Sequence, residues 1–120
     1  MPARPLSFSK GKRLTSPAEF ALIKETGQAH RGSLLIIGVK TDAETVGFRA
    51  GFVTSKRIGN AVRRNRVRRR LREIVRQRQA QLRNRIWIVT IARPAATRAS
   101  YRELEDEWLR LAKRASILAP

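Results

Sequence analysis

The sequence contains no cysteine, so disulfides and metal sites built on cysteine thiolates are excluded. This absence fits a reducing compartment, and we expect a cytoplasmic protein. The chain also lacks a long apolar run, because its longest, residues 34–39, has the length of a strand and is far too short to cross a bilayer. The N-terminal residues are basic without an apolar core, which argues against a secretory signal. We expect no membrane partner, and the sequence implies no protein partner.

Acidic residues are scarce, nine against 27 lysines and arginines, and their spacing is unsuited to catalysis. Hydrolytic metal sites need convergent carboxylates or histidines. Four of the nine acids crowd one expected helix at adjacent positions, where side chains diverge: Glu103, Glu105, Asp106 and Glu107. We interpret them as solvated partners of neighbouring arginines. His30 is the only histidine, and no nucleophile–base pair is visible around it. The sequence therefore predicts no catalytic residue in this chain.

Arginine is abundant, with 21 of the 27 basic residues, and the net charge is +18. The densest stretch, residues 56–78, holds 11 basic residues against one acid, Glu73. Apolar residues recur in and just after it at helical spacing: Val67, Leu71, Ile74, Val75 and Leu82. We therefore expect a basic helix packed on a core by one apolar stripe. Arginine makes forked contacts to phosphate and stacks on bases, which favours nucleic acid over an anionic membrane as the partner.

The remaining patterns predict one α+β domain over residues 15–116, after a flexible basic N-terminus over residues 1–14. The first expected element is a helix capped by Ser16 and ending before Gly27, followed by a hairpin of residues 33–40 and 46–55. The basic helix then runs from Asn60, its cap, to about Ala80. A strand at Ile86–Ala92 and a helix from the Ser100–Glu103 capping box to about Ala115 complete the domain. The arrangement is a helix–sheet sandwich around one sheet.

Two rows of arginines, the first headed by an asparagine, follow the surface of the basic helix. The first consists of Asn65, Arg68, Arg69, Arg72 and Arg76, and the second of Arg63, Arg66 and Arg70. A row of this length spans about 17 Å, enough to follow several phosphates. A solvated basic face without a specific partner is the alternative. Asn65 is compatible with a base edge, a phosphate, a hydrated metal or a plain surface amide. Phe20 fits either the core or a groove that stacks an unpaired base.

Over residues 56–73 the sequence resembles the bacterial ribonuclease P protein subunit. That family's signature runs Lys-Lys-x-Gly-x-Ala-Val-x-Arg-Asn-x-x-Lys-Arg-x-x-Arg-Glu, and this chain matches it with Arg57 and Arg68 in place of two lysines. Basic composition does not explain the agreement at Gly59, Ala61, Val62, Asn65 and Glu73. The resemblance covers roughly residues 10–115.

The resemblance implies a fold of α-β-β-β-α-β-α order with a central sheet and a left-handed βαβ crossover, against the usual right-handed rule. It also implies a short extra strand near residues 28–32. The implied function is that of the protein subunit of ribonuclease P, which binds the catalytic RNA and the 5′ leader of precursor tRNA and promotes endonucleolytic removal of that leader. The RNA subunit would catalyse the reaction with Mg²⁺, and the protein alone would be inactive.

The resemblance also implies site residues. The helix face of residues 64–72 would contact the catalytic RNA, and together with the two rows above the expected RNA-binding residues are Arg63, Arg64, Asn65, Arg66, Arg68, Arg69, Arg72 and Arg76. A cleft between the first helix, the basic helix and the sheet would hold the leader, with Phe20, Lys24, Ser55, Lys56 and Arg57 as its residues. The metal ligands are not identified, and Asn65 is the candidate. Two positions depart from the family: Lys24 replaces a frequent second aromatic, and Trp87 replaces a frequent Asp.

Two other function classes compete with this interpretation. A structural rRNA-binding protein of the ribosome fits the composition equally well, and only the pattern of residues 56–73 separates the two. A self-sufficient nuclease is disfavoured because the sequence offers no convergent carboxylates.

Overall fold

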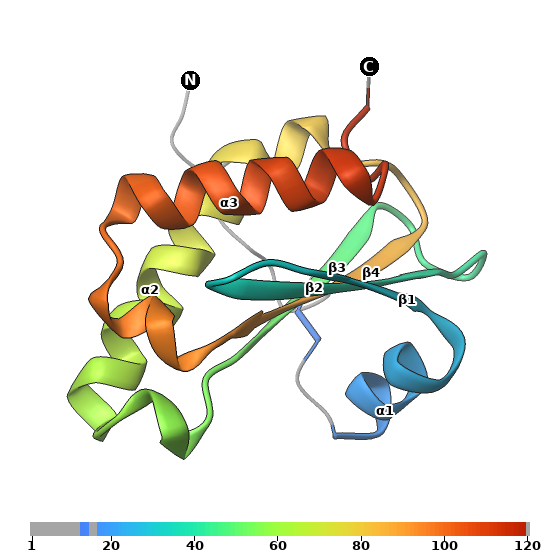
Figure 1. Ribbon diagram of the computed structural model, residues 1–120. Helices are drawn as coiled ribbons and strands as arrows, with labels where there is room; N and C mark the ends of the chain where they lie inside the picture. Colours follow the sequence, from blue (N-terminus) through green and yellow to red (C-terminus); the bar gives the residue numbers. More distant parts are fainter. Residues whose placement is uncertain (1–12, 15–16, 120) are drawn as a thin grey trace.

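The order of helices and strands follows the prediction. The structure is a computed structural model that describes residues 13–14 and 17–119 (Figure 1). Its elements are α1 (Pro17–Thr26), β1 (Gln28–Arg31), β2 (Leu35–Thr41), β3 (Phe48–Val53), α2 (Ala61–Arg78), β4 (Ile86–Ala92) and α3 (Tyr101–Arg114), with 3-10 turns η3 (Lys56–Ile58), η4 (Gln79–Gln81) and η5 (Pro94–Arg98). This is the expected α-β-β-β-α-β-α order of an α+β fold. Among the described residues, no helix has the length and apolarity to span a membrane.

The sheet has the strand order β1-β2-β4-β3, which makes the predicted hairpin wrong. Strands β2 and β3 are not neighbours, because β4 lies between them, antiparallel to β2 and parallel to β3. The reason is the composition of β4, which is apolar on both faces apart from Thr90 and is therefore buried best in the middle of the sheet. The antiparallel partner of β2 on its other side is β1, the extra strand near residues 28–32 that the resemblance implies. Helix α2 connects the parallel pair β3 and β4, and the handedness of this crossover stays a prediction.

The helices lie on both sides of the sheet, with α3 on one side and α1 on the other (Figure 1). The larger core packs α2 and α3 on one sheet face, and the predicted stripe residues Val67, Leu71, Ile74 and Val75 are all buried in it. Leu82 follows the helix and is only partly buried. The smaller core on the α1 side contains Leu14, Ile23 and Val89.

Both predicted helix caps that fall on described residues are present. The Asn60 side chain accepts a hydrogen bond from the Arg63 backbone N–H at 3.0 Å and so opens α2. Ser100 and Glu103 form the reciprocal capping box of α3. The predicted cap Ser16 and residues 1–12 of the predicted flexible segment lie outside the described residues. Leu14, at the end of that segment, is buried, and its N–H donates to the Ala50 carbonyl at 2.9 Å.

Trp87, one of the two departures from the family pattern, helps to fasten α1 to the sheet. Its indole N–H donates to Thr45 Oγ1 at 2.7 Å, and its ring lies 5.2 Å from Lys40 Nζ and 5.3 Å from the Arg49 guanidinium carbon. Arg49 in turn forms an ion pair with Glu19 of α1. An aromatic ring beside a guanidinium is a favourable cation–π contact, so Trp87 supports the arginine that holds the helix.

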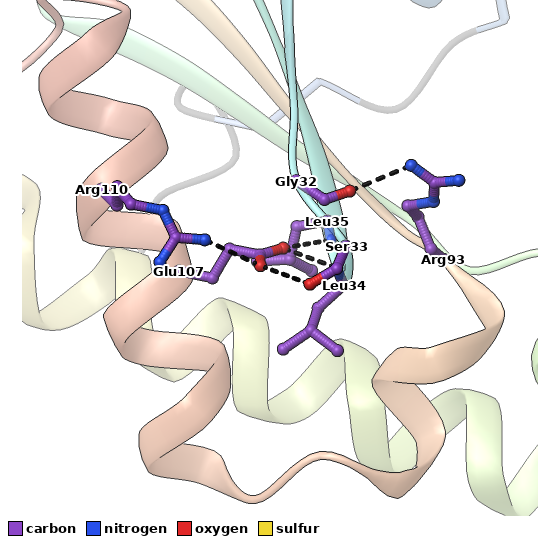
Figure 2. Close-up of polar contacts among 7 residues, drawn as sticks. All are labelled: Gly32, Ser33, Leu34, Leu35, Arg93, Glu107 and Arg110. Carbon is purple, nitrogen blue, oxygen red and sulfur yellow. Dashed lines mark hydrogen bonds and ion pairs between the residues drawn. The ribbon is translucent and has the colours of Figure 1, made fainter.

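Glu107 contradicts the interpretation of the α3 acids as solvated, because it is only 3% exposed. Its Oε2 atom accepts hydrogen bonds from the backbone N–H groups of Leu34 and Leu35, each at 2.7 Å (Figure 2). Its Oε1 atom accepts hydrogen bonds from Ser33 Oγ and Arg110 Nη2, each at 3.1 Å. A buried carboxylate is stable only with such partners. Glu107 thus ties α3 to the turn between β1 and β2.

The other acids of α3 have different roles. Glu103 forms the capping box, and Glu105 pairs with Arg78 at 3.5 Å, in agreement with the prediction of arginine partners.

The turn that Glu107 binds is held from its other side as well, since Arg93 donates to the Gly32 carbonyl at 3.0 Å (Figure 2). Gly32 has no room for a side chain, because a Cβ atom there would lie 2.5 Å from Glu107 Oε2.

Candidate nucleic-acid interface

Helix α2 presents its arginines on two flanks, because its apolar stripe occupies the side that faces the core. Arg68 and Arg72 project from one flank toward α1 and β3, where they line a hollow with Phe20. Arg63 and Arg66, members of the second predicted row, line a different hollow beside η3 and η5. The third member of that row, Arg70, donates to the Ala99 carbonyl at 3.1 Å and so braces α2 against the start of α3.

Arg68 is held in place by two side-chain acceptors. Its guanidinium donates to Asn65 Oδ1 at 3.1 Å and to Thr54 Oγ1 at 2.7 Å, and Thr54, which follows β3, is buried. Arg64 is also tied down, since it donates to the Gly59 carbonyl at 3.2 Å. A guanidinium held by two acceptors loses little freedom on binding a ligand with its remaining N–H groups.

Arg76, another predicted RNA-binding residue, is engaged by Glu73. Its Nε and Nη2 atoms donate to the Glu73 carboxylate at distances of 2.6 to 3.0 Å. The hydrogen bond from Arg76, and next that from Gln77, lowers the pKa of the Glu73 carboxyl, and the same pair raises the pKa of Arg76. By contrast, the side chains of Arg69 and Arg72 are exposed and make no hydrogen bond or ion pair within the described residues.

A two-part groove runs between α1 and the sheet. The smaller part, about 280 Å³, is lined by Phe20 of α1, by residues of β3, and by Arg13, Leu14, Arg68 and Arg72. The larger part, about 680 Å³, has an apolar floor and a rim that includes Lys24 and Arg31; the floor is formed by Ile36, Gly38, Val53, Val89 and Ile91. We call these two parts together the α1 groove. Apolar surface with a cationic border is the pattern that binds single-stranded nucleic acid.

Phe20 lies both in the smaller core and at the α1 groove, so the two positions left open by the sequence do not exclude each other, and its stacking on a base stays a prediction. It is half-buried against the small core of Leu14, Ile23 and Val89, and it lines both parts of the groove. Gly51 allows its close approach, because a Cβ atom there would lie 2.7 Å from Phe20 Cε1. The remaining surface of the ring faces the groove.

The other predicted leader-binding residues are divided between two places. Lys24 is exposed and lines the α1 groove. Ser55, Lys56 and Arg57 lie at the η3 turn, where Ser55 Oγ accepts the Arg57 N–H at 3.3 Å. The Arg57 side chain lines the hollow on the far flank of α2, so the structure does not bring it together with Phe20 and Lys24.

Three functional candidates were missed by sequence reasoning: Arg31, Thr54 and Arg98. Arg31 lies on β1, a strand too short and polar to be detected by alternation, and its register opposite Ile36 places it at the groove. Thr54 follows strand β3, and Arg98 is the last residue of the 3-10 turn η5. At neither position does a periodic sequence pattern mark a functional residue. Only the pairing of distant segments reveals them.

The described residues do not fit a metal ion bound directly by the protein. They contain no group of three or more histidines, cysteines or carboxylates that could hold one. The Oδ1 atom of Asn65, the candidate metal ligand, already accepts a hydrogen bond from Arg68, and the neighbouring residues in the sequence are mostly arginines. Divalent cations prefer several oxygen ligands and are repelled by such a cationic surface.

Comparisons with known proteins agree with this geometry. A sequence model of the ribonuclease P family matches residues 8–116. This chain belongs to the ribonuclease P family. The ribonuclease P protein component of Syntrophomonas wolfei is 36% identical over 112 residues, which cover 93% of each chain. That of Acidothermus cellulolyticus is 41% identical over 100 residues, 82% of this chain and 83% of the relative.

Solved structures of bacterial ribonuclease P proteins share the fold. The Staphylococcus aureus protein superposes with a TM-score of 0.84 at 25% identity, covering 89% of this chain and 97% of that one. The Thermotoga maritima protein gives 0.76 at 26% identity, covering 85% and 96%. Family membership makes this chain a protein component of the tRNA-processing endoribonuclease, with ribonuclease P RNA and precursor tRNA as its partners. The ribosomal alternative finds no support in these comparisons.

Proposed function

We propose that this chain holds the catalytic RNA of ribonuclease P with the arginines of α2 and the 5′ leader of precursor tRNA in the α1 groove. The observation that carries the proposal is the composition of this groove, which joins an apolar floor, an aromatic ring and a cationic rim beside the first arginine row. The groove would therefore place the substrate strand directly next to the RNA that cuts it.

The leader is a single strand, so its bases are free to stack and its phosphates are free to pair with cations. A base stacks on the exposed part of the Phe20 ring, while Lys24 and Arg31 contact phosphates along the rim. Arg68 and Arg72 reach the same strand from the α2 side. Lys24 stands where the family often has a second aromatic, so we expect this end of the groove to bind by charge rather than by stacking.

Catalysis itself belongs to the RNA subunit. The described residues hold no convergent set of carboxylates and histidines, and a Mg²⁺ ion used in the reaction is therefore held by RNA rather than by this chain. The chain contributes in two ways. Its net charge of +18 offsets the repulsion between enzyme RNA and substrate RNA. Binding of the leader also positions the scissile phosphate, which converts binding energy into rate. We place this activity in the cytoplasm, where tRNA is processed in bacteria.

The test is the affinity of reconstituted holoenzyme for two substrates, precursor tRNA and mature tRNA, with Phe20→Ala. Loss of one stacked base should weaken precursor binding by about 1–3 kcal/mol and leave mature tRNA, which has no leader, unaffected. Leu22→Ala is the matched control, because Leu22 lies on the same helix, is 42% exposed and lines neither part of the groove.

Phe20 also supports the small core, so melting temperatures accompany the binding data. Lys24→Gln serves as a second variant that changes the rim without touching the core. Equal losses for precursor and mature tRNA in both variants would contradict the proposal, since the groove would then have no preference for the leader.

A further inference from the structure

Trp87 lies in a row of paired residues that crosses the sheet on its α1 side. In the register of the strands, Trp87 pairs with Lys40 of β2 and with Arg49 of β3. Directly paired residues point to the same face of a sheet, and Trp87 packs against the smaller core on the α1 side. We call Lys40, Trp87 and Arg49 the Trp87 row.

Helix α1 crosses the sheet beside the Trp87 row. Two residues away along β2 and β3 are Gly38 and Gly51, over which α1 packs. A Cβ atom at Gly38 would lie 3.0 Å from Ile23 Cγ2, and one at Gly51 would lie 2.7 Å from Phe20 Cε1. Both glycines also line the α1 groove. The Trp87 row therefore lies next to the helix that forms one wall of this groove.

Arg49 joins α1 and the segment before it to the sheet. Its Nη1 atom forms an ion pair with Glu19 Oε2, and its Nη2 atom donates to the Arg13 carbonyl at 2.7 Å. The side chains of Arg49 and Glu19 are only 26% and 18% exposed, so salt screens their attraction less than that of a fully exposed pair. One guanidinium group thus fixes two segments.

Helix α1 has little buried surface of its own to hold it in place. It is ten residues long, too short to be stable alone in water, and Ile23 is the one buried residue among the ten. Glu19 directly precedes Phe20, so its ion pair holds the turn that carries the aromatic ring of the groove. A shift of this turn would move the ring away from the position in which a base stacks on it.

The Trp87 ring is itself fixed beside Arg49. Its indole N–H donates to Thr45 Oγ1 at 2.7 Å, and Thr45, which is buried, donates to Asp42 Oδ2 at 2.6 Å. The ring lies 5.3 Å from the guanidinium carbon of Arg49. A neutral ring attracts a guanidinium without forming an ion pair with it, so Arg49 remains available to Glu19. A carboxylate at position 87 would instead compete with Glu19 for the guanidinium.

We propose that Trp87 is a positioning residue for the 5′ leader, because it holds Arg49 against Glu19 and this ion pair holds the Phe20 ring at the α1 groove. The proposal rests on the leader binding proposed above and adds a residue that lines neither part of the groove. Since Trp87 acts through the groove, its replacement should weaken the binding of precursor tRNA and leave the binding of mature tRNA unchanged.

The experiment measures leader discrimination, which is the ratio of the affinities of reconstituted holoenzyme for precursor tRNA and for mature tRNA. Trp87→Asp should lower this ratio about three- to tenfold, a part of the value of one stacked base. Trp87→Leu, which removes the ring without adding a charge, should lower it about two- to fivefold and keeps the test open if the Asp variant does not fold. Trp87→Phe retains a ring beside Arg49 and should stay within about 1.5-fold of the wild type.

Trp108 supplies the matched control. It is fully buried in the larger core, and its indole N–H donates to Thr90 Oγ1 at 3.1 Å. Trp108→Phe therefore removes the same kind of hydrogen bond as Trp87→Phe and should lower the Tm. It should leave leader discrimination unchanged, because a loss of folded protein reduces the binding of both tRNAs equally.

Glu19→Gln tests the route by which Trp87 acts. This variant should itself lower leader discrimination, because it removes the charge that Arg49 holds. In the Glu19→Gln background, Trp87→Asp should cause less than about a 1.5-fold further loss, since two changes that break one interaction are not additive.

The outcomes separate the two proposals. If wild-type holoenzyme binds precursor and mature tRNA equally, the proposed function itself fails. If the wild type discriminates and Phe20→Ala reduces the discrimination, but the Asp and Leu variants of Trp87 keep the wild-type ratio, the positioning role is refuted. Additive losses from Trp87→Asp and Glu19→Gln would also overturn it, because Trp87 would then act by a route other than the ion pair.

Discussion

Replacing the buried Glu107 by glutamine tests how much of the fold depends on one carboxylate. The glutamine side chain keeps the shape of glutamate but carries one acceptor oxygen in place of two and no charge. Two backbone N–H groups, those of Leu34 and Leu35, now donate to the carboxylate at 2.7 Å each. In Glu107→Gln they retain at best a neutral acceptor, and the new amide N–H₂ points toward Ser33 and Arg110, which are donors in the present structure.

The magnitude follows from the hydrogen bonds. Hydrogen bonds to charged groups contribute about 1.5–3 kcal/mol and neutral ones about 0.5–1.5 kcal/mol. Losing the charge on the bonds from Leu34 and Leu35, and disturbing those from Ser33 and Arg110, should therefore cost about 2–3 kcal/mol. For a chain of this size that corresponds to a fall in Tm of roughly 6–12 °C. Glu107→Ala, which leaves both N–H groups without a partner, should cost about 3–5 kcal/mol.

Thermal and urea unfolding of purified variants supplies the measurement. Asp106→Asn is the matched control, because Asp106 is the adjacent acid, is exposed and makes no contact of this kind among the described residues. It should shift stability by less than about 0.5 kcal/mol. Equal stabilities for Glu107→Gln and Asp106→Asn would refute the account of the turn between β1 and β2.

Three further results are expected. Gly51→Ala should destabilise the fold by about 1–3 kcal/mol and weaken leader binding, because the added Cβ would lie 2.7 Å from the Phe20 ring; unchanged melting and binding would contradict this packing. The Glu73 pKa is lowered from 4.5 by Arg76, so its stabilising contribution is present above pH 4.5 and is lost as the pH falls through the lowered value. The Tm difference between wild type and Glu73→Gln should therefore shrink on acidification, and a constant difference would argue against the pair. Finally, RNA affinity should fall with salt at a log–log slope near −6 to −7 if about eight phosphates are neutralised, and a slope shallower than about −2 would refute the basic interface.

Local patterns were enough to predict α2 and its orientation. The apolar period placed Val67, Leu71, Ile74 and Val75 in the core, and short-range capping chemistry located Asn60 and the Ser100 box correctly. Such features depend on residues within one or two turns of each other, which a single sequence displays directly.

Features that depend on distant pairing were not predictable in the same way. Strand β4 lies between β2 and β3 because a strand that is apolar on both faces is stabilised most where both faces are covered. No turn signal in the sequence indicates this position. Glu107 is buried because backbone N–H groups 72 and 73 residues away need an acceptor. Arg57 has the same composition-based signal as its neighbours, and the packing of η3 against η5 places it at the hollow lined by Arg63 and Arg66 rather than at the α1 groove.

The most direct test of the central claim is cleavage of precursor tRNA across a magnesium titration, with the protein, the catalytic RNA, and both together. The account predicts no cleavage by the protein alone, slow cleavage by the RNA alone at high magnesium, and restored cleavage by the pair at physiological magnesium. The reason is that 27 cationic side chains and a leader-binding groove replace bound ions and position the substrate. Cleavage by rigorously RNA-free protein, or a magnesium requirement that the protein does not change, would contradict it.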